Sequence, residues 1–84
     1  MRVTKSASKH GISIEDGIQA ATWPAWVEPL DDDNEQWREL RLGFDTHARL
    51  LETVVIVASD GDELLIHVMK ARPKYAQLLD LKGL

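Results

Sequence analysis

The 84-residue sequence contains no cysteine, and only three prolines and five glycines interrupt it. The absence of cysteine excludes disulfide bonds, thiolate metal ligands and a cysteine nucleophile. No apolar run approaches the ~18 residues that a membrane span requires, and residues 1–9 lack the apolar segment of a signal peptide. We therefore expect a single small domain in the cytoplasm that makes no contact with a membrane.

Charge is unevenly distributed along the chain. The formal net charge is −4, which argues against non-specific binding of nucleic acid. Residues 1–14 and residues 64–79 nevertheless carry cations and no carboxylate, whereas the acidic residues concentrate between 28 and 35. If the two basic segments converge in space, they form a local positive patch that favours an enzyme acting on a polyanion. If they point apart, a protein-binding module is favoured.

The clearest local signal is a β-hairpin. Residues 50–57 and 64–69 are rich in aliphatic and β-branched side chains, and Asp60-Gly61 between them suits a two-residue turn. That turn predicts one register for the whole hairpin, in which Val54 lies opposite His67. Both faces of the hairpin are apolar near the turn, so we expect it to lie in the centre of a sheet.

The remaining elements are predicted from the periodicity of apolar residues and from the positions of proline. We expect short helices at residues 3–10 and 14–21, an edge strand within 25–30, a strand at 36–44 and a helix from Pro73 onward. The predicted fold class is α+β, with two short N-terminal helices, a four-stranded antiparallel β-meander and a C-terminal helix. If residues 45–48 form a four-residue turn and Phe44 pairs with Arg49, Arg41 lies opposite Glu52.

Three motifs resemble the BrnT family of bacterial toxins, within the RelE-like group of small ribonucleases. They are K-H-G-I-S at residues 9–13, E-L-R-L-G at 39–43 continued by A-R-L-L at 48–51, and K-A-R-P-K at 70–74. The chain departs from the family in its acidic loop at residues 59–63 and in a nearly apolar final helix.

The resemblance implies a RelE/BrnT-like fold and the toxin component of a bacterial type II toxin–antitoxin system. It further implies a metal-independent ribonuclease that needs no cofactor and is neutralised by a small antitoxin protein. The implied substrate is RNA, either free or as ribosome-bound mRNA. The sequence leaves a homodimer open.

Cleavage of RNA by side chains alone needs a proton acceptor, a proton donor and cations that stabilise charge on the phosphate. The candidate catalytic residues are His67 and His10 as acid or base, Glu52 to orient an imidazole, and Arg72 to contact phosphate. The alternative is structural: His67 merely covers the sheet, Glu52 forms a cross-strand ion pair, and His10 ends the first helix.

Further cations are candidates for binding the RNA phosphates: Lys9, Arg41, Lys70 and Lys74. The three histidines of the chain lack the spacing of a metal site, so we expect no bound metal.

Trp23, Trp26 and Trp37 flank the acidic segment around the predicted edge strand. Tryptophan is enriched at the energetic centres of protein interfaces. They therefore suggest a second function, in which the chain is a non-catalytic interaction module that keeps the toxin fold and binds a protein partner.

Overall fold

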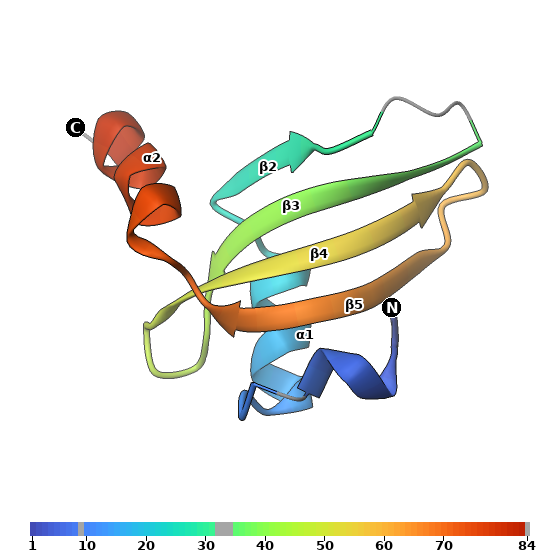
Figure 1. Ribbon diagram of the computed structural model, residues 1–84, viewed down its shortest axis with the longest axis horizontal. Helices are drawn as coiled ribbons and strands as arrows, with labels where there is room; N and C mark the ends of the chain where they lie inside the picture. The colour runs from blue at the N-terminus through green and yellow to red at the C-terminus, as the bar shows by residue number, and fades with distance from the viewer. Residues whose placement is uncertain (9, 32–34, 84) are drawn as a thin grey trace.

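The computed structural model describes residues 1–8, 10–31 and 35–83, and Figure 1 shows the arrangement of the elements. In chain order these are β1 (Arg2–Val3), the 3-10 helix η1 (Lys5–Ser8), α1 (Ile14–Thr22), β2 (Trp26–Pro29), β3 (Gln36–Phe44), β4 (Leu50–Ala58), β5 (Glu63–Lys70) and α2 (Pro73–Gly83). Within these residues, no helix is both long enough and apolar enough to cross a membrane.

The strands form one mixed five-stranded sheet in the order β1-β5-β4-β3-β2. The pairs from β5 to β2 are antiparallel, but β1 pairs in parallel with β5, with Arg2 beside Leu64 and Val3 beside Leu65. The predicted four-stranded, purely antiparallel sheet is therefore wrong. Parallel strands need a long connection, and β1 and β5 are separated by most of the sequence. Their pairing brings the N-terminal segment next to the last strand.

The prediction of two N-terminal helices is also wrong. Within the predicted first helix, the described residues form the end of β1 and the short η1 instead of an α-helix. The β-branched Val3 and Thr4 favour extended backbone, and the backbone N–H of Thr4 donates to the carbonyl of Leu65 at 3.0 Å. The extended start of this segment leaves room for only one turn of 3-10 helix.

Helix α1 lies against one face of the sheet. Ser13 is its N-cap, and the Ser13 hydroxyl accepts a hydrogen bond from the Asp16 N–H at 3.2 Å. At its other end the helix presents Ala20 and Ala21, both fully buried, to the sheet. Small side chains allow the helix and sheet backbones to approach closely, and Gly43 on β3 makes the approach closer still: a Cβ there would lie 2.1 Å from the Ala20 carbonyl oxygen.

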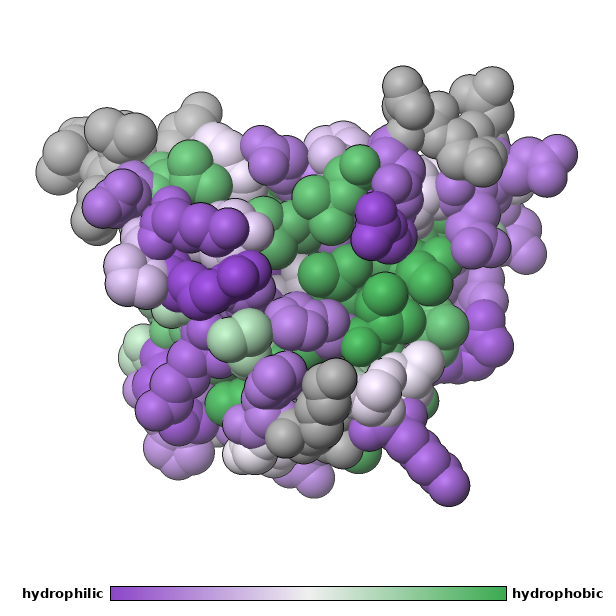
Figure 2. All heavy atoms as spheres, viewed as in Figure 1, coloured by the Kyte–Doolittle hydropathy of each residue, from purple (hydrophilic) through white to green (hydrophobic). Residues whose placement is uncertain are grey.

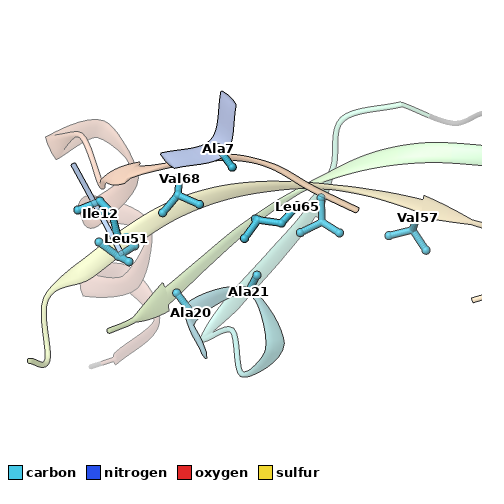
Figure 3. Close-up of a cluster of buried hydrophobic side chains, with 9 residues drawn as sticks. Ala7, Ile12, Ala20, Ala21, Leu51, Val57, Leu65 and Val68 are labelled. Carbon is cyan, nitrogen blue, oxygen red and sulfur yellow. The ribbon is translucent and has the colours of Figure 1, made fainter. Parts of the chain in front are cut away.

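The main core fills the layer between the sheet, α1 and η1, and Figure 3 shows its side chains pointing toward one another. From the sheet it takes alternate residues of β4 and two residues of β5. The buried members are Ala7, Ile12, Ala20, Ala21, Leu51, Val55, Val57, Leu65 and Val68.

The opposite face of the sheet is also largely apolar, and none of the described helices lies over its middle. In Figure 1 α1 lies behind the strands while α2 stands beyond one end of the sheet, so Figure 2 looks directly onto this second face and shows an apolar area across it. We call it the open face. By strand alternation and register it carries Trp26, Glu28, Arg38, Leu40, Leu42, Glu52, Val54, Ile56, Leu64, His67 and Met69.

The predicted register of the central hairpin holds in one half only. Val54 does lie opposite His67, but Val55 lies opposite Leu65, so Ile66 is an extra residue on β5. Such a bulge shifts the alternation of side chains beyond it. The shift lets both Leu65 and Val68 face the core, which strict alternation would forbid.

Candidate functional site

Four side chains meet at the end of the open face that lies nearest α2. Glu52 comes from β4, His67 from β5, Arg72 from the link between β5 and α2, and His10 from the segment after η1. We call this group the His–Glu–Arg cluster. It contains all four residues that the sequence analysis proposed as catalytic.

Glu52 is the centre of the cluster. Its side chain is only 2% exposed, and its oxygens accept hydrogen bonds from Arg72 Nε and Nη2, both at 3.0 Å, and from the Arg72 backbone N–H at 3.2 Å. Oε2 also lies 3.4 Å from His67 Nε2. Burial by itself raises the pKa of Glu52, but the bonds from Arg72 and His67 outweigh it and lower the pKa below its usual value. Glu52 is therefore held as a carboxylate.

Arg72 presents one edge of its guanidinium to Glu52 and leaves half of its side chain exposed. Nε and Nη2 bind the carboxylate, while half of the side chain is exposed and the guanidinium lies over the Tyr75 ring, 5.2 Å from its centroid. Lys74 also places its Nζ over this ring, at 4.9 Å. The bond to Glu52 raises the pKa of Arg72. A charged guanidinium that is half exposed can donate hydrogen bonds to a phosphate.

The two imidazoles of the cluster touch each other. The rings of His10 and His67 lie edge to face, with centroids 5.5 Å apart and planes inclined by 72°. His67 is partly exposed and His10 is exposed, so solutes reach both. Gly11, with a φ of +78°, turns the chain after His10, and buried Ile12 anchors the segment in the core.

Arg41 does not belong to this cluster, contrary to the predicted register. Leu42 lies opposite Glu52, and Arg41 lies opposite Thr53 on the face that α1 covers. There its side chain is 10% exposed, and its guanidinium donates to the Ala21 carbonyl at 2.9 Å and to Glu63 at 2.7 Å. Arg41 therefore binds the C-terminal end of α1 and is not placed to bind phosphate beside Glu52.

The lysines that were proposed to bind phosphate are dispersed. Lys9 lies outside the described residues. Lys70 is exposed but lies opposite Leu51, so it projects from the α1 side of the sheet. Lys74, at the start of α2, is the one of these three that the structure places beside the cluster, through the Tyr75 ring that it shares with Arg72.

The two basic segments converge at their histidines. Two of their arginines are paired with carboxylates, Arg2 with Asp62 and Arg72 with Glu52. This convergence is the arrangement that the sequence analysis associated with an enzyme.

The three tryptophans do not form one surface. Trp23 follows α1 and is 77% exposed, while Trp26 lies on the open face opposite Leu42. Trp37 lies on the other face, packs against the main core and donates from Nε1 to Glu39 at 2.8 Å. The three tryptophans therefore cannot contact one partner through a single surface.

A group with metal-ligand chemistry occurs at the β3–β4 turn, where atoms of Asp16, Asp45 and His47 lie within 4.8 Å of one another. Sequence spacing gave no sign of it, because Asp16 comes from a different element. Asp16 accepts two hydrogen bonds from Thr46, and Asp45 accepts two backbone N–H groups and the Arg49 guanidinium. These bonds lower the pKa of Asp16 and, against the opposing effect of burial, that of Asp45. The carboxylates already serve to hold the turn.

Comparison of the chain with family models, curated proteins and solved structures finds no match. The resemblance to BrnT toxins therefore rests on the sequence motifs, and any assignment of chemistry rests on the geometry of the His–Glu–Arg cluster.

Proposed function

We propose that the protein is a metal-independent ribonuclease and the toxin component of a bacterial toxin–antitoxin pair, active in the cytoplasm. The observation that carries the proposal is the contact between His10 and His67, with His67 held against the buried carboxylate of Glu52. Two members of the His–Glu–Arg cluster lie in the BrnT-like motifs: His10 in K-H-G-I-S and Arg72 in K-A-R-P-K.

The chemistry requires no group beyond these side chains. A neutral imidazole removes the proton from a ribose 2′-OH, the 2′-oxygen attacks the adjacent phosphorus, and the bond from phosphorus to the 5′-oxygen breaks. A protonated imidazole donates its proton to that leaving oxygen. Imidazoles suit both roles because they change protonation state near neutral pH. The products are a 2′,3′-cyclic phosphate and a 5′-hydroxyl, and two touching rings can serve both ester oxygens of one phosphate.

Glu52 and Arg72 have supporting roles in this scheme. Glu52 orients His67 through the 3.4 Å contact between Oε2 and Nε2. It also holds Arg72, whose half-exposed side chain can stabilise the charge that develops on phosphate. Lys74 adds a second cation beside the same aromatic ring. An antitoxin with acidic side chains would inhibit by occupying these cations.

The test is cleavage of a single-stranded RNA oligonucleotide by the purified protein, in the presence of EDTA. We expect products with cyclic phosphate ends, no cleavage of the 2′-O-methyl analogue, and a bell-shaped dependence of rate on pH. His67→Ala and His10→Ala should each lower the rate by about 100-fold or more, the usual contribution of a general acid or base. His47→Ala is the matched control, since His47 is exposed in the β3–β4 turn. Intact RNA with the wild-type protein, or equal rates for all three variants, would refute the proposal.

The second candidate is the protein-interaction module. One observation favours it: the open face is apolar over the middle of the sheet (Figure 2), where none of the described helices lies (Figure 1). This face, and not the three tryptophans together, is where a partner would bind.

A further inference from the structure

One large aromatic side chain lies exposed beside the His–Glu–Arg cluster and has no role in the chemistry described above. Phe44 is the last residue of β3, and it is 47% exposed. A single exposed apolar residue is common on protein surfaces and needs no explanation by itself. What distinguishes Phe44 is the direction in which its ring points and the charged groups that lie next to it.

Phe44 points to the open face, which is the face that carries the cluster. The preceding residue, Gly43, faces α1, since a Cβ on it would lie 2.1 Å from the Ala20 carbonyl oxygen. Successive side chains of a strand point to opposite faces of the sheet. Phe44 therefore points away from α1, to the same side as Glu52, which lies opposite Leu42.

Phe44 and the cluster are neighbours across the strands. Phe44 pairs with Leu50, which comes two residues before Glu52 on β4. Such diagonal positions on one face are ~7–8 Å apart, within reach of an aromatic side chain. The Leu50 carbonyl also accepts the Ala71 N–H at 3.0 Å, and Arg72 follows directly in the chain. The ring thus stands beside Glu52 and Arg72, at the end of the sheet where β5 leads into α2 (Figure 1).

The backbone that carries the Phe44 ring is held from both sides. The Gln19 side chain donates to the Phe44 carbonyl at 3.2 Å. The next residue, Asp45, closes the turn, because its N–H donates to the Arg49 carbonyl at 2.9 Å. The Asp45 carboxylate in turn accepts the backbone N–H groups of His47 and Arg49. An aromatic side chain on a fixed backbone has little freedom to lose when a ligand binds, so less of the binding free energy is spent on ordering it.

The charged groups beside the ring present cations to solvent, although the formal net charge of the chain is −4. Glu52 is buried and paired, whereas Arg72 is half exposed and Lys74 is exposed in the first turn of α2. A strand of RNA at this end of the sheet therefore meets the two cations and the aromatic ring before it meets the carboxylate. Proteins bind single-stranded nucleic acid through this combination, in which cations contact the phosphates and bases stack on aromatic rings.

We propose that Phe44 is a stacking platform for one unpaired base of the RNA substrate. This role rests on the proposed ribonuclease and specifies its substrate as single-stranded, because a base inside a duplex offers the ring no free face. Glu52 lies between Phe44 and His67 along the open face, since it comes two residues after the partner of Phe44 and two before the partner of His67. The stacked base is therefore one that flanks the cleaved bond, and the contact contributes to RNA affinity and not to proton transfer.

Binding of a single-stranded 2′-O-methyl RNA oligonucleotide, which lacks the attacking hydroxyl, separates stacking from cleavage. Measured by fluorescence anisotropy, Phe44→Ala should weaken binding by about 5- to 150-fold, the range for one base stacked on an aromatic ring. Phe44→Tyr keeps the ring and should bind as the wild type does. Phe44→Leu keeps only apolar bulk and should bind as weakly as Phe44→Ala. Trp23→Ala is the matched control and should bind normally, because Trp23 is 77% exposed at the end of α1, behind the sheet (Figure 1).

The cleavage assay supplies a second measurement. Phe44→Ala should raise KM for single-stranded RNA by a similar factor and leave kcat nearly unchanged, since the contact is the same before and during the reaction. Circular dichroism checks that each variant is folded, and the comparison of Phe44→Leu with Phe44→Tyr decides the question if Phe44→Ala does not fold.

Stacking and cleavage can fail separately. Equal binding by the wild type, Phe44→Ala and Phe44→Leu would overturn the stacking, and the ribonuclease would stand if RNA is still cleaved. Binding that depends on the Phe44 ring without any cleavage would support the stacking and refute the ribonuclease. A wild type that binds no single-stranded RNA would overturn the stacking as well.

Discussion

Replacing Gly43 by alanine tests how closely α1 lies against the sheet. A Cβ at this position would lie 2.1 Å from the Ala20 carbonyl oxygen and 2.7 Å from its carbonyl carbon, both backbone atoms that no rotamer change can move. The helix would have to retreat by roughly 1 Å to restore ordinary van der Waals contact, and a gap of that size forfeits a quarter to a half of each contact's attraction. Overpacking of this kind costs about 3 kcal/mol.

That cost is large for so small a domain. At ~0.05–0.15 kcal/mol per residue, the free energy of unfolding is ~4–13 kcal/mol. The melting temperature of Gly43→Ala should fall by ~12–24 °C, at ~4–8 °C per kcal/mol for a domain of this size. Thermal and urea unfolding followed by circular dichroism measure the effect.

Gly17→Ala is the matched control for Gly43→Ala, because Gly17 lies on α1 at the same interface. Its added Cβ would meet the side chain of Val68 at 2.9 Å, and a side chain can shift where backbone cannot. Alanine also gains ~1 kcal/mol of helix propensity over glycine. We expect Gly17→Ala to cost much less than Gly43→Ala. If Gly43→Ala unfolds within about 1 kcal/mol of the wild type, the close helix–sheet approach is wrong.

Two further predictions concern the buried ion pairs. Because the folded-state pKa of Glu52 is lowered from 4.5, its ionised form contributes stability that is complete above that pH and is lost as pH falls below it. The difference in urea unfolding free energy between the wild type and Glu52→Gln should therefore shrink between about pH 6 and pH 3, and a constant difference would contradict the assignment. Arg41→Met leaves Glu39 and Glu63 without their shared partner, so it should cost about 3–5 kcal/mol in urea unfolding. Arg38→Met removes a surface pair and should change little; equal effects of the two substitutions would show that Arg41 is not buried as described.

The long strands were predictable because each carries a sustained pattern. β3, β4 and β5 each contain eight or nine residues, enough for alternation and β-branched content to show. β1 has only two residues and no period of its own. Its place in the sheet depends on Leu64 and Leu65, more than sixty residues away, and a tertiary contact of that range leaves no local mark in the sequence.

The register error between β3 and β4 has a specific cause in the turn. Asp45 donates from its backbone N–H to the Arg49 carbonyl, so the loop contains three residues and not the four that were expected. Three-residue hairpin loops need a residue with positive φ, usually glycine, and here Ala48 takes that role at φ +60°. An alanine in the sequence does not indicate such a turn. A shift of one residue moves a side chain to the other face, which is why Arg41 lies under α1 and Leu42 takes its place.

The candidate site was predictable where its geometry depends on the half of the hairpin that has the expected register. Glu52 and His67 share a face because the expected register holds between Val54 and the end of β5. The approach of His10 to His67 could not be derived from pairing, since it depends on the N-terminal segment lying beside β5.

The parallel pairing of β1 with β5 also constrains the order in which the chain acquires its structure. Thr4 and Leu65, which are joined where β1 ends, stand 61 residues apart. A chain that leaves the ribosome N-terminus first therefore carries β1 without its neighbour until β5 has been synthesised, and closing so long a loop is slow relative to forming the hairpin. Since the N-terminal segment lies beside β5 only after that closure, His10 and His67 come together late, after β5 has been synthesised.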